Sequence, residues 1–329
     1  MRNIAAKFSA GAREKTELNM DVSDAVDSLF AGAVPERIEE LRGLWGEHAD
    51  RVRLLAVDRF LIQMGFGSVQ ISELALRQIW ITGYAAWRAV NAYNVPLALA
   101  SLTMSSADRG EWRRIYADVA AREDEFAELF GAIRGIAEAA KFGNIDTFPW
   151  PAGVPNPEYG LKITDPGLKG AFDLVCMAGA YVFAHEVRHY IYEAQNNSPQ
   201  HLLEEETECD RWALALMLDR ASDYAVDNGW KPDLVRAKRI LGVIIAQLAI
   251  LAITPRTSWD HSDGHPPVCN RIRSVLDAAT DPVPTWFWTT IASMLLGFAS
   301  QSGVLVETIP VTSDMRELAY TLCDRLQSA

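Results

Sequence analysis

The sequence predicts a mainly α-helical protein with a small β-sheet, and three features of the chain indicate the helical class. Apolar residues recur at helical spacing almost throughout residues 22–142. A stretch rich in proline and glycine, residues 143–170, then interrupts the pattern. After it, residues 171–194 contain no proline, are mostly apolar and return to a period of about four. One long helix is therefore expected there, preceded by an irregular connection.

The domain organisation follows from length and from this interruption. A chain of 329 residues with 49% hydrophobic content can bury one large core or two modest ones, and its length favours two units. We predict a helical N-terminal region over residues 1–142 and a second unit over residues 143–329. Residues 1–21 are polar and irregular, and are expected to form a tail.

Two helices are expected within the N-terminal region. The apolar spacing of the first is shown by Leu54, Leu55, Phe60 and Leu61. The second begins after Ser72, because serine is a good helix cap, and it has an aromatic face. That face consists of Ile79, Trp80, Tyr84 and Trp87. Aromatic residues at helical spacing are typical of a buried core surface.

The proline-rich stretch 143–170 has two interpretations. Its composition is typical of a linker between the two units. Alternatively, short extended pieces at residues 145–148 or 161–164 form a small sheet before the long helix, and an extended peptide adds to the edge of that sheet as a further strand. The predicted small sheet rests on the second interpretation.

The long helix carries the sequence A-H-E-V-R-H at residues 184–189. His185 and His189 are four residues apart, so they lie on one face of the helix and can bind a single metal ion. Glu186 follows closely enough to accept a proton from a reacting water molecule. This H-E-x-x-H pattern is typical of zinc sites that hydrolyse peptide bonds, so zinc is the expected cofactor.

A third ligand is expected from the helix that follows a turn at residues 196–200 and spans residues 202–220. Glu206 and Asp210 are four residues apart on a face that continues into the core. Glu206 is therefore the predicted ligand, and Asp210 the predicted partner for the outer nitrogen of a ligand histidine. Glu205 is the alternative ligand, and a charged helix N-terminus is a further interpretation of this acidic run.

Far downstream, the string H-P-P-V-C-N-R begins at His265 and ends at Arg271. Its two prolines suit the first turn of a helix, where their missing N–H groups have no partner to lose. His265 would be held firmly beside them and is a candidate catalytic residue that stabilises negative charge in the transition state. Arg271 is a candidate partner for a buried carboxylate. A surface turn with a solvated arginine is the alternative.

The composition excludes several classes of partner. The chain has 31 basic and 43 acidic residues and a net charge of -12, which disfavours nucleic acid and anionic membranes. The apolar segments 240–253 and 282–306 are respectively too short and too polar for a typical membrane span. The four scattered cysteines form no C-x-x-C pair, and no apolar leader is visible, so a cytoplasmic location is expected.

Three pieces in this order, H-E-V-R-H, E-T-E-C-D and H-P-P-V-C-N-R-I, resemble those of gluzincin metallopeptidases. The last two are also similar to pieces of CAAX-processing and HtpX-type enzymes, which span membranes. The closer resemblance is to the Lit-like phage-exclusion peptidases, the peptidase U49 family. It implies a zincin-like fold with zinc bound by His185, His189 and Glu206. It also implies that Glu186 is the catalytic base and that the substrate is a host protein, in the Lit case a translation elongation factor.

Two other classes of function share parts of this pattern. ImmA-like proteins pair a zincin helix with acidic downstream helices and inactivate repressors, often beside a DNA-binding module, but no basic stripe or helix-turn-helix signal is visible here. A structural zinc is normally closed by four protein ligands, often cysteines. Since this pattern supplies three, it favours a zinc endopeptidase acting on a cytoplasmic protein.

Overall fold

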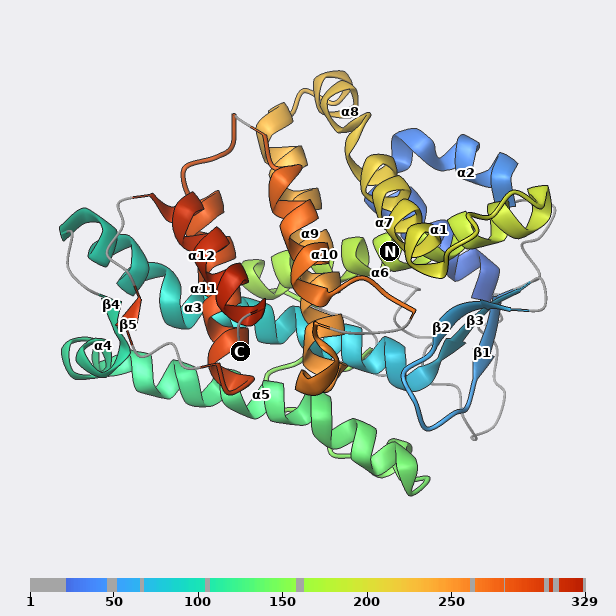
Figure 1. The fold of residues 1–329 in the computed structure, drawn as a ribbon. Helices are drawn as coiled ribbons and strands as arrows, with labels where there is room; N and C mark the ends of the chain where they lie inside the picture. The colour runs from blue at the N-terminus through green and yellow to red at the C-terminus, as the bar shows by residue number, and fades with distance from the viewer. Residues whose placement is uncertain are drawn as a thin grey trace.

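Most of the described chain is helical, and one small three-stranded sheet lies at one end of the molecule (Figure 1). The computed structural model describes residues 22–45, 52–65, 68–103, 107–157, 163–260, 264–280, 282–304, 308–309 and 314–327. The predicted class, mainly α with a small sheet before the long helix, is confirmed. The expected tail, residues 1–21, lies outside the described residues.

The elements before the proline-rich stretch are short helices, the strands of the sheet, one further short strand and two long helices. In chain order they are α1 (Val22–Ala33), the 3-10 helix η2 (Pro35–Arg37), α2 (Ile38–Trp45), β1 (Val52–Leu55), β2 (Ile62–Gly65), β3 (Ser68–Ser72), α3 (Glu73–Thr103), β4 (Ala107–Asp108), α4 (Arg109–Ile115) and α5 (Ala117–Lys141).

The remaining elements are helices, apart from one short strand that pairs with β4. They are η4 (Ile145–Thr147), α6 (Pro166–Gln195), α7 (Leu202–Leu218), α8 (Ala221–Asp227), α9 (Pro232–Ile253), η6 (Arg256–Ser258), α10 (Val268–Asp277), α11 (Phe287–Gln301), β5 (Thr308–Ile309) and α12 (Met315–Gln327).

The sheet has the order β1-β3-β2, with β1 parallel and β2 antiparallel to β3, so β2 lies at an edge. The helix predicted from the apolar residues between 54 and 61 is therefore wrong, because that segment forms β1 and the approach to β2. Apolar runs this short fit both a helical and an extended period. The strands β1 and β2 both pair with β3, at Val69 and Ile71, and this pairing with another segment selects the extended conformation.

The sheet was expected in the wrong segment. Residues 145–147, one predicted strand, form the 3-10 helix η4. Residues 163–164 of the other have no regular structure, and residues 161–162 lie outside the described residues. Prolines remove the N–H groups that a strand ladder needs, which explains why this stretch connects helices instead.

Helix α3 begins where the sequence predicts, whereas α6 begins before the expected stretch 171–194. Ser72 caps α3, with its Oγ accepting from the backbone N–H of Ala75 at 3.1 Å. Asp165 caps α6 and accepts from the backbone N–H of Leu168 at 2.8 Å, with Pro166 in the first turn. The same helix ends at Asn196, whose φ of 50° places it in the left-handed region.

Helix α6 lies at the centre of the hydrophobic core and contacts α1, α3, α7, α9 and the edge strand β2. Two glycines allow this close packing, because a Cβ atom at Gly83 on α3 or Gly242 on α9 would overlap side chains of α6. The core includes residues on both sides of residue 142. The predicted division into two units stays a prediction.

The apolar segments considered as membrane spans lie in helices α9 and α11, whose side chains are largely buried in the core. Among the described residues, only α6 is long and apolar enough to cross a membrane by length and composition. Most of that helix is buried inside the protein, as expected for the core helix of a folded domain.

Candidate metal centre

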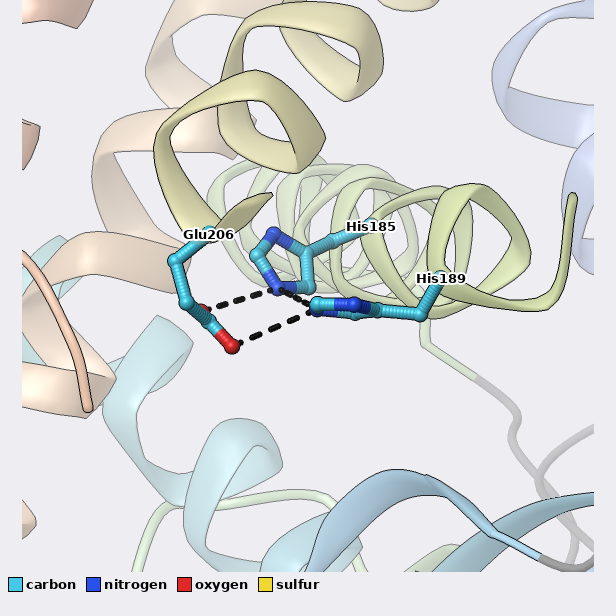
Figure 2. A group of neighbouring side chains, drawn as sticks. All are labelled: His185, His189 and Glu206. Atoms are coloured by element: carbon cyan, nitrogen blue, oxygen red, sulfur yellow. Dashed lines mark hydrogen bonds and ion pairs between the residues drawn. The ribbon is translucent and has the colours of Figure 1, made fainter. Parts of the chain in front are cut away.

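Helix α6 presents two imidazoles on the face that looks toward α7 (Figure 2). His185 and His189 are one turn apart, and their Nε2 atoms approach to 3.1 Å. Both side chains are largely buried, with exposed fractions of 8% and 12%. The predicted spacing therefore places the two ring nitrogens close enough to share one ion.

Helix α7 supplies the third group. One carboxylate oxygen of Glu206 lies 3.3 Å from Nε2 of His185, and the other lies 3.3 Å from Nε2 of His189. Figure 2 shows the carboxylate facing both rings. One ligand atom from each of these three residues lies within 4.8 Å of the others, a separation that a metal ion can bridge. The group can therefore hold a metal ion.

The outer nitrogens of both imidazoles meet carboxylates of α7. Nδ1 of His185 lies 3.0 Å from Oδ1 of Asp210, and Nδ1 of His189 lies 2.7 Å from Oε1 of Glu205. Ionised carboxylates only accept hydrogen bonds, so each Nδ1 donates, and when a ring is neutral its Nε2 carries the lone pair that can bind a metal ion. Of the two glutamates considered as ligands, Glu206 faces the Nε2 atoms and Glu205 orients a ring from outside.

Asp210 is itself held by two further side chains. Arg271 on α10 donates to its Oδ1 at 2.6 Å, and the hydroxyl of Tyr181 lies 2.9 Å from the same oxygen. Burial raises the pKa of Asp210, but the charge of Arg271 and the hydrogen bond from His185 outweigh it and keep the carboxyl ionised. Arg271 thus lies beside a buried carboxylate, as the sequence suggested, whereas Tyr181 is not among the predicted site residues.

His265 also reaches the group, from the turn before α10. Its Nδ1 lies 2.9 Å from Oε2 of Glu206, while 61% of its side chain stays exposed. That oxygen of Glu206 is buried and has no hydrogen bond of regular geometry, although two imidazole nitrogens lie near it. A buried carboxylate oxygen without a regular partner among the described residues, beside two imidazole Nε2 atoms that can bind a metal ion once deprotonated, fits a site that holds a cation.

Glu186 points toward the sheet. Its carboxylate accepts a hydrogen bond from the backbone N–H of Met64 on β2, and only 7% of the residue is exposed. Burial raises the pKa of Glu186, and the nearby histidines lower it less than burial raises it. A carboxyl group with a raised pKa takes up a proton more readily near neutral pH.

The charges of His185, His189 and Glu206 depend on one another. Burial lowers the pKa of His185 and of His189, but hydrogen bonds to carboxylates outweigh burial and raise each pKa to about 9. Burial raises the pKa of Glu206, yet the surrounding imidazoles hold it far below its usual range. In the metal-free protein, Glu206 is therefore the counter-charge of the protonated histidine pair.

These residues line a cleft of about 650 Å³. One wall consists of residues 60–64, which include most of β2. Apolar side chains of the helices also line the cleft, namely Ile79, Val182, Ala246, Ala249, Ile250 and Ile253. No described residue of the proline-rich stretch 143–170 lines the cleft. The sequence prediction of its wall therefore missed β2, because the stretch around residues 54–61 that leads into this strand was expected to be a helix.

A buried His-His-Glu group on two helices, with an adjacent glutamate and a sheet edge beside it, defines a candidate metal-dependent hydrolase. The family model described as Peptidase U49 matches residues 69–288, more than half of the chain. The protein therefore belongs to the peptidase U49 family, as the motifs predicted, and this membership implies peptide hydrolysis. Comparisons with curated proteins and with solved structures give no match.

Proposed function

We propose that this protein is a zinc-dependent endopeptidase in which His185, His189 and Glu206 bind the metal. One observation carries the proposal: the three groups converge on one point at the cleft, and each imidazole has its outer nitrogen bound to a carboxylate. Two imidazoles and one carboxylate suit zinc and leave a coordination position for the reacting molecule. When bound there, zinc would polarise the scissile carbonyl and make an attacking water more acidic.

Glu186 is the proposed catalytic base. It follows His185 on α6 and is bound to the edge strand, so it lies between the metal ligands and the place where a peptide would lie. Its raised pKa suits a group that takes the proton of the attacking water and then passes it to the leaving amine.

His265 is proposed to stabilise the negative charge that develops on the scissile carbonyl oxygen. Its Nδ1 faces Glu206, and its exposed ring lies at the cleft, within reach of a bound peptide. The same contact gives His265 a second effect, because it helps to hold the Glu206 carboxylate in place. Loss of turnover with zinc retained would separate the first effect from the second.

The proposed substrate is a protein segment in extended conformation. The cleft runs along residues 60–64, and β2 is the edge strand of its sheet, so an extended segment can add beside it. From the resemblance to Lit, we infer a cytoplasmic protein, such as a host translation factor cleaved during phage infection. A negative net charge of -12 fits a protein substrate better than a nucleic acid.

The test combines metal analysis with a search for the substrate. Purified wild type is expected to contain about one zinc per chain, and His185→Ala much less. The wild type and Glu186→Gln are then expressed in bacteria, challenged with phages and compared for new protein N-termini. A host protein cut only by the wild type supports the proposal. Identical N-termini under every challenge would refute the phage-exclusion role and favour a metal-binding regulator.

A further inference from the structure

The hydrogen bonds around His185 continue beyond Asp210 into the core. The hydroxyl of Tyr181, one turn before His185 on α6, lies 2.9 Å from Oδ1 of Asp210. Nε2 of Gln247 on α9 donates to the same hydroxyl at 3.0 Å. Tyr181 is 2% exposed and Gln247 is fully buried. Four side chains on three helices therefore form one buried chain that ends at His185.

The chemistry of the four groups fixes the direction of this chain. Asp210 is ionised and can only accept, so the single proton of the Tyr181 hydroxyl is donated to it. The hydroxyl oxygen then has room to accept, and the amide nitrogen of Gln247 supplies the donor. At the other end, Nδ1 of His185 must donate to the same carboxylate. The hydrogen bonds therefore run from Gln247 to Tyr181 and on to Asp210, which also accepts from His185.

We propose that Tyr181 and Gln247 are positioning residues for the metal ligand His185. They hold the Asp210 carboxylate in the orientation that receives Nδ1–H of His185, which keeps Nε2 of that ring pointed at the metal position. The role rests on the proposed zinc site. Neither residue touches the reacting atoms, so their effect reaches the metal only through Asp210 and His185.

Tyr181 could also be buried simply because it packs in the core. A second buried tyrosine in the chain allows the two effects to be compared. Tyr84 on α3 is 1% exposed, and its buried hydroxyl has no hydrogen-bond partner among the residues that the structure describes. Changing either tyrosine to phenylalanine removes one buried oxygen atom. Only the change at Tyr181 removes a donor to Asp210, so the difference between the two variants isolates positioning from packing.

The experiment measures zinc affinity by competition with a chromophoric chelator, and the visible spectrum of the cobalt-substituted protein. We expect Tyr181→Phe to bind zinc about tenfold more weakly than wild type and to change the cobalt spectrum. Tyr84→Phe should match wild type in both. Gln247→Met, which keeps the volume and loses the donor, should weaken zinc binding by a smaller factor. Circular dichroism of the metal-free proteins checks that every variant is folded.

The dependence on Asp210 gives a second measurement. In an Asp210→Asn background, adding Tyr181→Phe should have little further effect, because the acceptor that Tyr181 orients has changed. Wild-type affinity and spectrum in Tyr181→Phe, or an equal loss in both backgrounds, would overturn the positioning role. If wild type itself binds no zinc, the proposed function fails and this role fails with it. Normal zinc binding by wild type with an unchanged Tyr181→Phe overturns the positioning role alone.

Discussion

Two adjacent glutamates on α7 allow a sharp test of the candidate metal centre. Glu206 faces both Nε2 atoms at 3.3 Å, whereas Glu205 contacts only the outer nitrogen of His189. Replacing each by glutamine keeps the side-chain shape and removes one charge. Structural zinc sites bind with about 10–16 kcal/mol, usually through four protein ligands, which is about 3 to 4 kcal/mol per ligand. Loss of a ligand therefore weakens zinc binding by about 100-fold to 1000-fold.

The expected result is a large loss for Glu206→Gln and a small one for Glu205→Gln. The second variant should lose about tenfold, at the low end of the range for groups that orient a ligand, because glutamine Oε1 can still accept from Nδ1 of His189. Glu204→Gln, an exposed change on the same helix, is the control and should bind zinc like wild type. The assay is chelator competition at one pH with metal-free protein. A larger loss for Glu205→Gln than for Glu206→Gln would refute the ligand assignment.

Four further predictions concern the base, the exposed histidine, the pH dependence and the thiols. Glu186→Gln should retain zinc but lose about 10²-fold to 10⁴-fold in peptidase rate, and an unchanged rate would exclude a role as base. His265→Ala should keep zinc and lose about 2 to 4 kcal/mol of transition-state stabilisation, measured as kcat/KM. In the metal-free folded protein, prepared with a chelator, the pKa values of His185 and His189 are about 9, above the unfolded value of 6.5. Protonation of the two rings therefore stabilises the fold fully below about pH 6.5, and this contribution is lost as the pH rises toward 9. The melting temperature of metal-free wild type should therefore fall toward that of His189→Gln over this range, and a constant difference would contradict it. All four cysteines are buried with pKa values of about 12, so a thiol reagent at pH 8 should label them only after unfolding.

The local parts of the fold and site were predictable because they depend on the helical repeat. Spacing of four residues placed His185 and His189 on one face of α6, and the same spacing on α7 put Glu206 beside Asp210. The cap residue Ser72 located the start of α3 for the same reason, since a cap acts on backbone groups two or three residues away. The match to the peptidase U49 family over residues 69–288 confirms the family that the three motifs predicted.

Other features of the site depend on contacts between distant segments, and no local pattern encodes these. The strand β2 forms the cleft wall by pairing with β3, although its apolar residues also fit a helix. Tyr181 and Gln247 meet because α6 and α9 pack closely, and a single-helix pattern shows neither as polar partners. His265 reaches Glu206 across 58 intervening residues that only the folded chain brings together. The sequence by itself determined which residues lie on one helical face, whereas tertiary packing decided which faces meet, because side-chain periodicity is local and the energy of packing is gained between elements far apart in the chain.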